Sequence, residues 1–167
     1  MNKYLSSANA KVKTLAEVIE FNKKNHSESM PYFEQEILEK AEKKSDLNSA
    51  EYKEALEKVL SLSREKGIDA MLAEHTLDAI IAPTGGPAWP IDLINGDHFG
   101  GGSSSPAARA GYPNITVPAG YVFGLPVGMS IFGGAYKEPE LIAIAYAFEQ
   151  ASKVRVAPTL PEKLTFI

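Results

Sequence analysis

The residues with the clearest chemical potential form one run near the middle of the chain. Residues 100–105 are three glycines followed by three serines, and Asp97 and His98 stand just before them. A glycine-rich turn can present several backbone N–H groups to an anion, and a serine hydroxyl beside a base can serve as a nucleophile. One hypothesis is therefore a small autonomous hydrolase that uses the Ser103–Ser105 loop with Asp97 or His98.

A simpler interpretation of the same run needs no ligand. Ser105 is a good N-cap for a short helix that begins at Pro106 and ends at Gly111 as its C′ residue. The glycines of residues 100–102 then only allow the loop to turn. Because no other base stands near the serines in the sequence, we favour this structural interpretation.

The three histidines are scattered and predict no metal site. None lies three or four residues from another, which is the spacing that places two ligands on one helix face. His26 and His75 are expected at the C-termini of helices, where a cation is weakly favoured. His98, beside Asp97 in the loop 95–100, is retained as a site candidate. Nucleotide-binding and nucleophile-elbow motifs are missing, and the sequence predicts neither a metal nor an organic cofactor.

Hydrophobic periodicity and end signals predict helices in the first half of the chain. Thr14 followed by Glu17 is a capping box that starts a helix running to about Asn25. Pro31 is expected in the first turn of a second helix, and Gly67 is expected to end the third helix as its C′ residue. The predicted helices are 14–25, a helix from about 31 that carries Phe33, Ile37, Leu38 and Ala41, 49–66 and 70–75.

Three short apolar strands and a closing helix are predicted in the second half. The strands are 79–82, 114–118 and 126–132, and the helix is 138–151. Residues 79–82, Ala-Ile-Ile-Ala, show no polar alternation, which suits a strand covered on both faces, as in a parallel sheet. The expected fold class is α/β, with a small mixed sheet flanked by amphipathic helices.

Charge divides the chain into two segments. Residues 1–78 hold 27 of the 38 charged side chains but one glycine and one proline, whereas residues 79–167 hold 12 of the 13 glycines and 10 of the 11 prolines. We therefore expect a charged helical segment and a Gly/Pro-rich segment containing the strands, which together form one domain.

The composition argues against several classes of function. A net charge of −4 disfavours nucleic-acid binding, which needs a basic face. The lack of cysteine excludes a disulfide framework and a thiolate nucleophile. No apolar run approaches the roughly 20 residues that span a bilayer, and the N-terminus lacks the apolar core of a secretory signal. A cytoplasmic protein without membrane partners is expected.

Three blocks of sequence carry a family resemblance. They are residues 77–84 (LDAIIAPT), residues 110–120 (AGYPNITVPAG) and residues 124–133 (GLPVGMSIFG). With these blocks the chain resembles the C-terminal part of amidase signature enzymes, and their peptide-amidase-like members most. The resemblance covers nearly the whole chain and implies that it forms part of an α/β/α fold.

The resemblance also implies a Ser–Ser–Lys hydrolase with an oxyanion hole in a Gly/Ser-rich loop. Those residues belong to the N-terminal half of such enzymes, and residues 100–105 lie where the family has a variable loop. No catalytic residue is therefore assigned in this chain. The favoured hypothesis is the C-terminal portion of an amidase, which supplies scaffold and a pocket wall, is inactive alone, and meets a small amide substrate only in the complete enzyme. A non-catalytic binding or assembly module is the alternative.

The loop from Pro83 to Ser105 is the candidate wall of that substrate pocket. It leaves the end of a predicted strand, where open α/β sheets bind ligands. Its candidate pocket residues are Trp89, Asp97, His98 and Phe99. A packed structural role for Trp89, the only tryptophan, is the alternative.

Uncharged strand edges predict association with another chain. Residues 79–82 and 115–117 would offer apolar edges, which are templates for pairing. The expected partner is a second copy, giving a homo-oligomer, or the missing N-terminal half of an amidase. A monomer whose turns and N-terminal helices shield the edge is the alternative.

Overall fold

The computed structural model describes residues 1–159. The chain divides into two compact units, Met1–Lys53 and Glu54–Ile167. This division falls inside helix α5 (Ala50–Ser63), whereas the composition changes near residue 78. The compact units therefore do not coincide with the two compositional segments, and each unit is described by itself.

The first unit is entirely helical in its regular structure. Its helices are α1 (Asn2–Ser7), α2 (Leu15–Lys24), α3 (His26–Ser29) and α4 (Glu36–Glu42). The predicted cap of α2 is confirmed, because the Thr14 hydroxyl accepts a hydrogen bond from the Glu17 N–H at 3.1 Å. His26 starts α3, a helix that the sequence analysis did not predict, and its ring lies 2.9 Å from the Glu34 carboxylate.

The helix predicted from Pro31 begins five residues later, at Glu36. The side chain of Gln35 is buried, donates to the Ile19 carbonyl at 3.1 Å and accepts from the Asn22 amide at 3.0 Å. These two bonds to α2 hold the segment before α4 in a non-helical conformation. A long-range contact thus overrides the local start signal.

The second unit begins with three helical segments in direct succession. Helix α5 continues into a π-helical turn, η1 (Arg64–Ile68), and then into α6 (Asp69–Glu74). The prediction that Gly67 ends the helix is wrong. A Cβ at Gly67 would lie 2.6 Å from the Leu62 carbonyl oxygen, so the glycine permits the close approach of backbone in the π turn.

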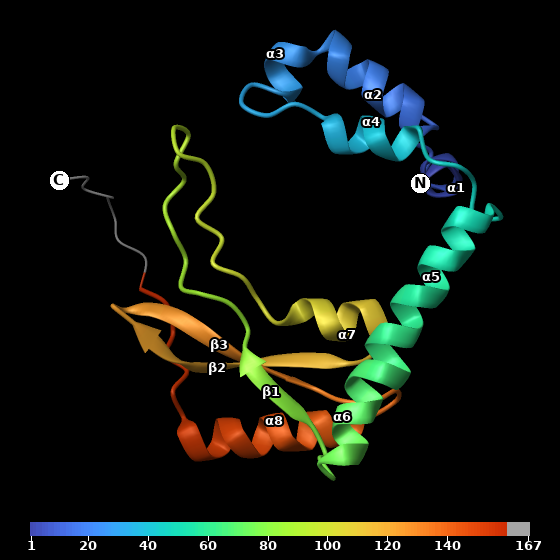
Figure 1. The fold of residues 1–167 in the computed structure, drawn as a ribbon. Helices are drawn as coiled ribbons and strands as arrows, with labels where there is room; N and C mark the ends of the chain where they lie inside the picture. The colour runs from blue at the N-terminus through green and yellow to red at the C-terminus, as the bar shows by residue number, and fades with distance from the viewer. Residues whose placement is uncertain (160–167) are drawn as a thin grey trace. The chain divides into compact units, whose positions relative to one another are not determined.

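A small antiparallel sheet forms the centre of the second unit (Figure 1). Its strands β1 (Ile80–Pro83), β2 (Asn114–Val122) and β3 (Leu125–Phe132) lie in the order β1-β3-β2. The α/β class is confirmed, but the sheet expected to be mixed is antiparallel throughout residues 1–159. Strand β1, expected to be covered on both faces, pairs on one side and leaves Ile81 63% exposed.

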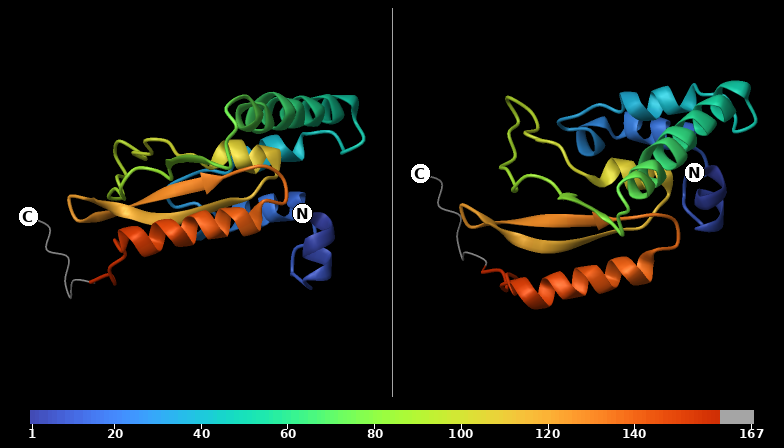
Figure 2. Two further views of the ribbon diagram at one scale, coloured as in Figure 1. Left: turned by 90° about the horizontal axis from the view of Figure 1, so that it is seen from below. Right: turned by 60° about the horizontal axis from the view of Figure 1, so that its bottom comes forward.

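Helices cover both faces of this sheet (Figures 1 and 2). On one face, α8 (Glu138–Ser152), the predicted closing helix, packs on β2 and β3. On the other face lie η1 and α7 (Ser104–Ala110). The two buried clusters are Val117, Ile131, Leu141 and Ala145 on the α8 face, and Ile68, Ala107, Ala110 and Phe132 on the α7 face.

Polar contacts fasten α7 to the π turn. The Arg64 guanidinium donates to the Ala110 carbonyl at 2.6 Å and lies over the Tyr112 ring. The Tyr112 hydroxyl donates to Asp69 at 2.8 Å, and burial together with this bond raises the pKa of Tyr112. Gly111 ends α7 in the left-handed conformation, as predicted.

The start of α7 differs from the prediction. The helix begins at Ser104, two residues before Pro106, and its N-cap position is Ser103 rather than Ser105. The Ser103 side chain makes no capping hydrogen bond. Among the helices of residues 1–159, none is both long enough and apolar enough to cross a bilayer.

Candidate functional site

The connection from β1 to α7 is a long projecting loop, which we call the arm (residues 85–102). The two halves of the arm meet at its base through an isolated antiparallel bridge between Gly85 and Gly102. From there the chain rises to a turn and returns to α7 (Figure 1). The arm lies within the predicted candidate wall, Pro83 to Ser105, and contains all four candidate pocket residues.

Asp92 organises the turn at the tip of the arm. Its carboxylate accepts the backbone N–H groups of Ile94 and Asn95 at 2.9 and 2.8 Å and the Asn95 side-chain amide at 2.9 Å. The His98 ring nitrogen lies 3.2 Å from the same carboxylate. These contacts, with the Asn95 N–H the strongest, hold the pKa of Asp92 far below its ordinary range.

The remaining candidates contact one another across the arm. The Trp89 indole N–H donates to the Asp97 carboxylate, and the Trp89 and Phe99 rings are 6.0 Å apart in a tilted arrangement. Trp89 is 38% exposed and Phe99 is 66% exposed. The four predicted residues therefore take part in two sets of contacts across the arm. Trp89 contacts Asp97 and Phe99, and His98 contacts Asp92.

Asp92 was missed in the sequence analysis, although a signal was present. In residues 92–96, Asp-Leu-Ile-Asn-Gly, an aspartate stands three residues before an Asn-Gly pair. This is the pattern of a turn in which the Asp side chain accepts backbone N–H groups ahead of it. The pattern predicts a turn rather than a catalytic group.

The serines after the arm do not assemble with a base. In residues 1–159, Asp97 and His98 find their side-chain partners in Trp89 and Asp92, and none of the three serine hydroxyls hydrogen-bonds to either residue. The Ser103 hydroxyl is buried without a partner, and Ser104 and Ser105 are exposed in the first turn of α7. Hydroxyl activation needs an adjacent base. The geometry therefore gives no support to the autonomous serine hydrolase.

An open apolar cavity of about 590 Å³ lies beside the base of the arm. It is built from residues of all three strands and the first residues of the arm. Its lining residues are Ile81, Ala82, Pro83, Gly85, Pro87, Ala119, Val122, Val127, Gly128 and Met129. A cavity of this composition suits apolar groups and carries no titratable side chain of its own.

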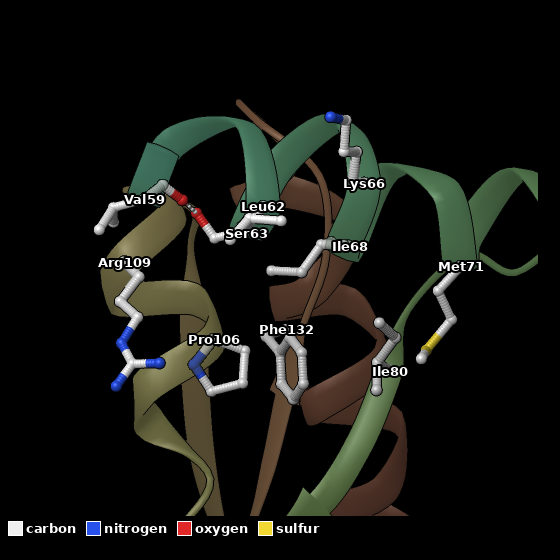
Figure 3. A pocket seen from close by; sticks show the side chains of 11 residues that line it. Val59, Leu62, Ser63, Lys66, Ile68, Met71, Ile80, Pro106, Arg109 and Phe132 are labelled. Carbon is white, nitrogen blue, oxygen red and sulfur yellow. Dashed lines mark hydrogen bonds between the residues drawn. The ribbon is translucent and has the colours of Figure 1, made fainter. Parts of the chain in front are cut away.

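A second cavity of about 410 Å³ lies among the helices of the second unit (Figure 3). Apolar side chains of α5, η1, α6 and the sheet line most of it, including Leu62, Ile68 and Phe132. The Ser63 hydroxyl at its edge donates to the Val59 carbonyl at 2.6 Å. Lys66 and Arg109 stand at the rim (Figure 3). Within residues 1–159, neither cation hydrogen-bonds to the Ser63 hydroxyl, which donates to the Val59 carbonyl. The cavity therefore shows no activated nucleophile.

Within residues 1–159, no three His, Asp or Glu side chains are placed to hold a metal ion together. The candidate site therefore consists of the arm and the apolar cavity at its base. Such a site can bind and orient a substrate, whereas breaking an amide bond also requires a nucleophile and a base.

Comparison with known protein families identifies the family of this chain. The family model described as Amidase matches residues 1–142. The chain belongs to the amidase family. The resemblance inferred from the three sequence blocks is thereby confirmed.

Individual relatives support this assignment. A probable amidase of Arabidopsis thaliana is 38% identical over 161 residues, which cover 95% of this chain and 28% of that protein. One of the glutamyl-tRNA(Gln) amidotransferase subunits of Clostridium acetobutylicum is 42% identical over 109 residues, which cover 62% of this chain and 22% of that protein. Both matches span only part of the relative.

A solved structure confirms the fold. The crystal structure of a peptide amidase in complex with the competitive inhibitor chymostatin superposes with a TM-score of 0.91 at 43% identity. The match covers 95% of this chain and 32% of the peptide amidase chain. The chain thus spans about a third of the length of this amidase, which is consistent with the predicted C-terminal portion.

Proposed function

We propose that this chain supplies the scaffold and one wall of the substrate pocket of an amidase and does not itself hold the nucleophile and base. The superposition of nearly the whole chain on about a third of a peptide amidase carries the proposal. The engagement of Asp97 and His98 in the arm, away from the serine hydroxyls, also supports it. The reaction of the complete enzyme is hydrolysis of an amide C–N bond.

The arm and the apolar cavity at its base form the proposed pocket wall. Gly85 and Pro87 link the two features, because they belong to the arm and line the cavity. Trp89, Asp97, His98 and Phe99 lie farther along the arm and are proposed to contact the substrate or its entrance. The polar tip and apolar base would together suit an amide that carries an apolar group.

The purified chain is expected to release no ammonia from a short peptide amide or a simple aliphatic amide. Without an activated nucleophile, only weak positioning effects remain. Ammonia release should equal that of buffer for the natural chain and for the matched variants Ser103→Ala, Ser104→Ala and Ser105→Ala. Turnover above buffer that one of these substitutions abolishes would instead establish the autonomous serine hydrolase.

The free edge of β1 is the proposed surface for association. Within residues 1–159, β1 pairs only with β3, and Ile81 presents an apolar side chain beside the 590 Å³ cavity. An unpaired apolar edge is a template for another strand. We propose that it pairs with a second copy in the isolated chain and with the remaining amidase segment in a complete enzyme. A cytoplasmic location belongs to the same proposal, and the lack of cysteine fits it.

Replacing Ile81 by Lys is expected to convert an associated chain into a monomer. A lysine on an edge strand opposes pairing because its charge would be buried in the contact. Sedimentation equilibrium at micromolar concentration should show a dimer or larger species for the natural chain and one 18.0 kDa species for Ile81→Lys. Ile142→Lys, at a side chain 57% exposed on α8, is the matched control and should associate as the natural chain does. A natural chain that sediments as a monomer would contradict the proposal.

A further inference from the structure

We propose that Thr84 is a positioning residue that clamps both ends of the arm to the sheet. Thr84 directly follows β1 and stands at the start of the arm. Its N–H donates to the Gly128 carbonyl at 2.8 Å, and its own carbonyl accepts the Ser103 N–H at 3.2 Å. Its hydroxyl lies 2.9 Å from the Ser130 hydroxyl and 3.4 Å from the Thr116 hydroxyl. Thr84, at the start of the arm, thus contacts the residue that follows the arm as well as strands β2 and β3.

Ser130 is the buried member of this hydroxyl cluster, whereas Thr84 is half-buried and Thr116 is exposed. Ser130 is 1% exposed, and its register partner in β2 is Thr116, whose hydroxyl lies 3.3 Å away. A buried hydroxyl that loses its partners costs free energy because water cannot replace them. Ser130 therefore favours the arrangement in which Thr84 turns its hydroxyl toward the sheet, and this arrangement also fixes the backbone of Thr84.

Two glycines leave the space that Thr84 occupies. A Cβ at Gly128 would lie 2.9 Å from the Thr84 hydroxyl oxygen and 2.8 Å from the Thr116 methyl carbon. A Cβ at Gly102 would lie 2.9 Å from the Thr84 carbonyl oxygen. Contacts this short are not tolerated without movement, so both the sheet and the returning end of the arm are shaped around Thr84.

The clamp determines the direction in which the arm leaves the sheet. Thr84 and Ser103, which share a backbone hydrogen bond, directly flank the first and last residues of the arm, Gly85 and Gly102. Loss of the Thr84 hydroxyl would loosen both ends at once. That the arm is a substrate wall rests on the proposed function, whereas the clamp itself can be tested without any assay of activity.

The test compares Thr84→Val with Thr84→Ser in the full chain. Valine keeps the branched shape and removes the hydroxyl, whereas serine keeps the hydroxyl. Trp89, the only tryptophan, lies on the arm and reports its state through acrylamide quenching of fluorescence. Loss of one hydrogen bond corresponds to a change of up to about tenfold in a local opening equilibrium. We expect Thr84→Val to raise Trp89 quenching and to speed amide exchange across residues 85–103 by about tenfold, and Thr84→Ser to match the natural chain.

Two further variants keep the test decisive. Ser105→Ala removes an exposed hydroxyl near the end of the arm and should change neither readout. Ser130→Ala removes the buried partner of the Thr84 hydroxyl and should reproduce the Thr84→Val result. This variant replaces Thr84→Val in the test if Thr84→Val does not fold. The clamp is overturned if Thr84→Val leaves quenching and exchange unchanged, or if Thr84→Ser loosens the arm as much as valine does. Neither outcome depends on whether the chain serves an amidase.

Discussion

Replacing Ile131 by Ala is expected to lower the free energy of unfolding by about 3 kcal/mol, within the usual range for truncating a buried isoleucine. Ile131 is the second-last residue of the central strand β3 and is fully buried. It packs with Leu141 and Ala145 of α8 and with Val117 of β2. Its truncation would leave a cavity between the sheet and α8, the helix that packs against it.

The same substitution at Ile142 provides the matched control. Ile142 follows Leu141 on α8 but is 57% exposed, so Ile142→Ala should change stability by less than about 0.5 kcal/mol. Urea unfolding followed by circular dichroism would measure both variants. Equal losses at the two positions would contradict the packing of α8 against β3.

The elements that could be predicted are those whose signals are local. Thr14 caps α2 through a residue three positions away, and Gly111 ends α7 by adopting a conformation that glycine allows. The strand 126–132 and the helix from Glu138 were predicted close to their observed bounds, whereas β2 was predicted from its first residue but with an end at 118 instead of Val122. In each case the physical cause lies within one turn or one strand of the residue that reveals it.

The errors arose where distant contacts decide the local structure. Glycine is a common residue at helix ends, which led to the prediction for Gly67. The glycine is instead needed because the backbone of Leu62 lies close to it in the π turn. Proline is common in the first turn of a helix, which led to the prediction for Pro31. The hydrogen bonds of Gln35 to α2 keep the segment before Glu36 non-helical, so the helix begins later. The apolar residues 79–82 suggested cover on both faces, whereas the described residues cover Ile81 only in part.

The candidate site was predicted in part for the same reason. The loop that carries Trp89, Asp97, His98 and Phe99 could be found from its length and composition. The Thr84 hydroxyl cluster could not, because Thr84 and Ser130 are 46 residues apart and meet only through the register of β1 and β3. Periodicity identifies strands but does not determine which strands become neighbours.

A hybrid enzyme offers the strongest functional contrast. In this hybrid, the chain would replace the matching 32% of the peptide amidase with which it superposes. The identity of 43% and the TM-score of 0.91 predict that the strands and the arm would take the places of their counterparts. Misplacement of reacting groups by about 1 Å costs roughly a hundredfold in rate, so kcat/KM within about a hundredfold of the parent enzyme is expected.

The rate of ammonia release from a peptide amide by this hybrid, compared with the peptide amidase lacking the same segment, tests most directly whether this chain builds an amidase pocket. Circular dichroism and a single melting transition would first establish that the hybrid is folded. We expect hydrolysis by the folded hybrid and none by the truncated enzyme. A folded hybrid that releases no more ammonia than the truncated enzyme would contradict the claim that this chain can build an amidase pocket.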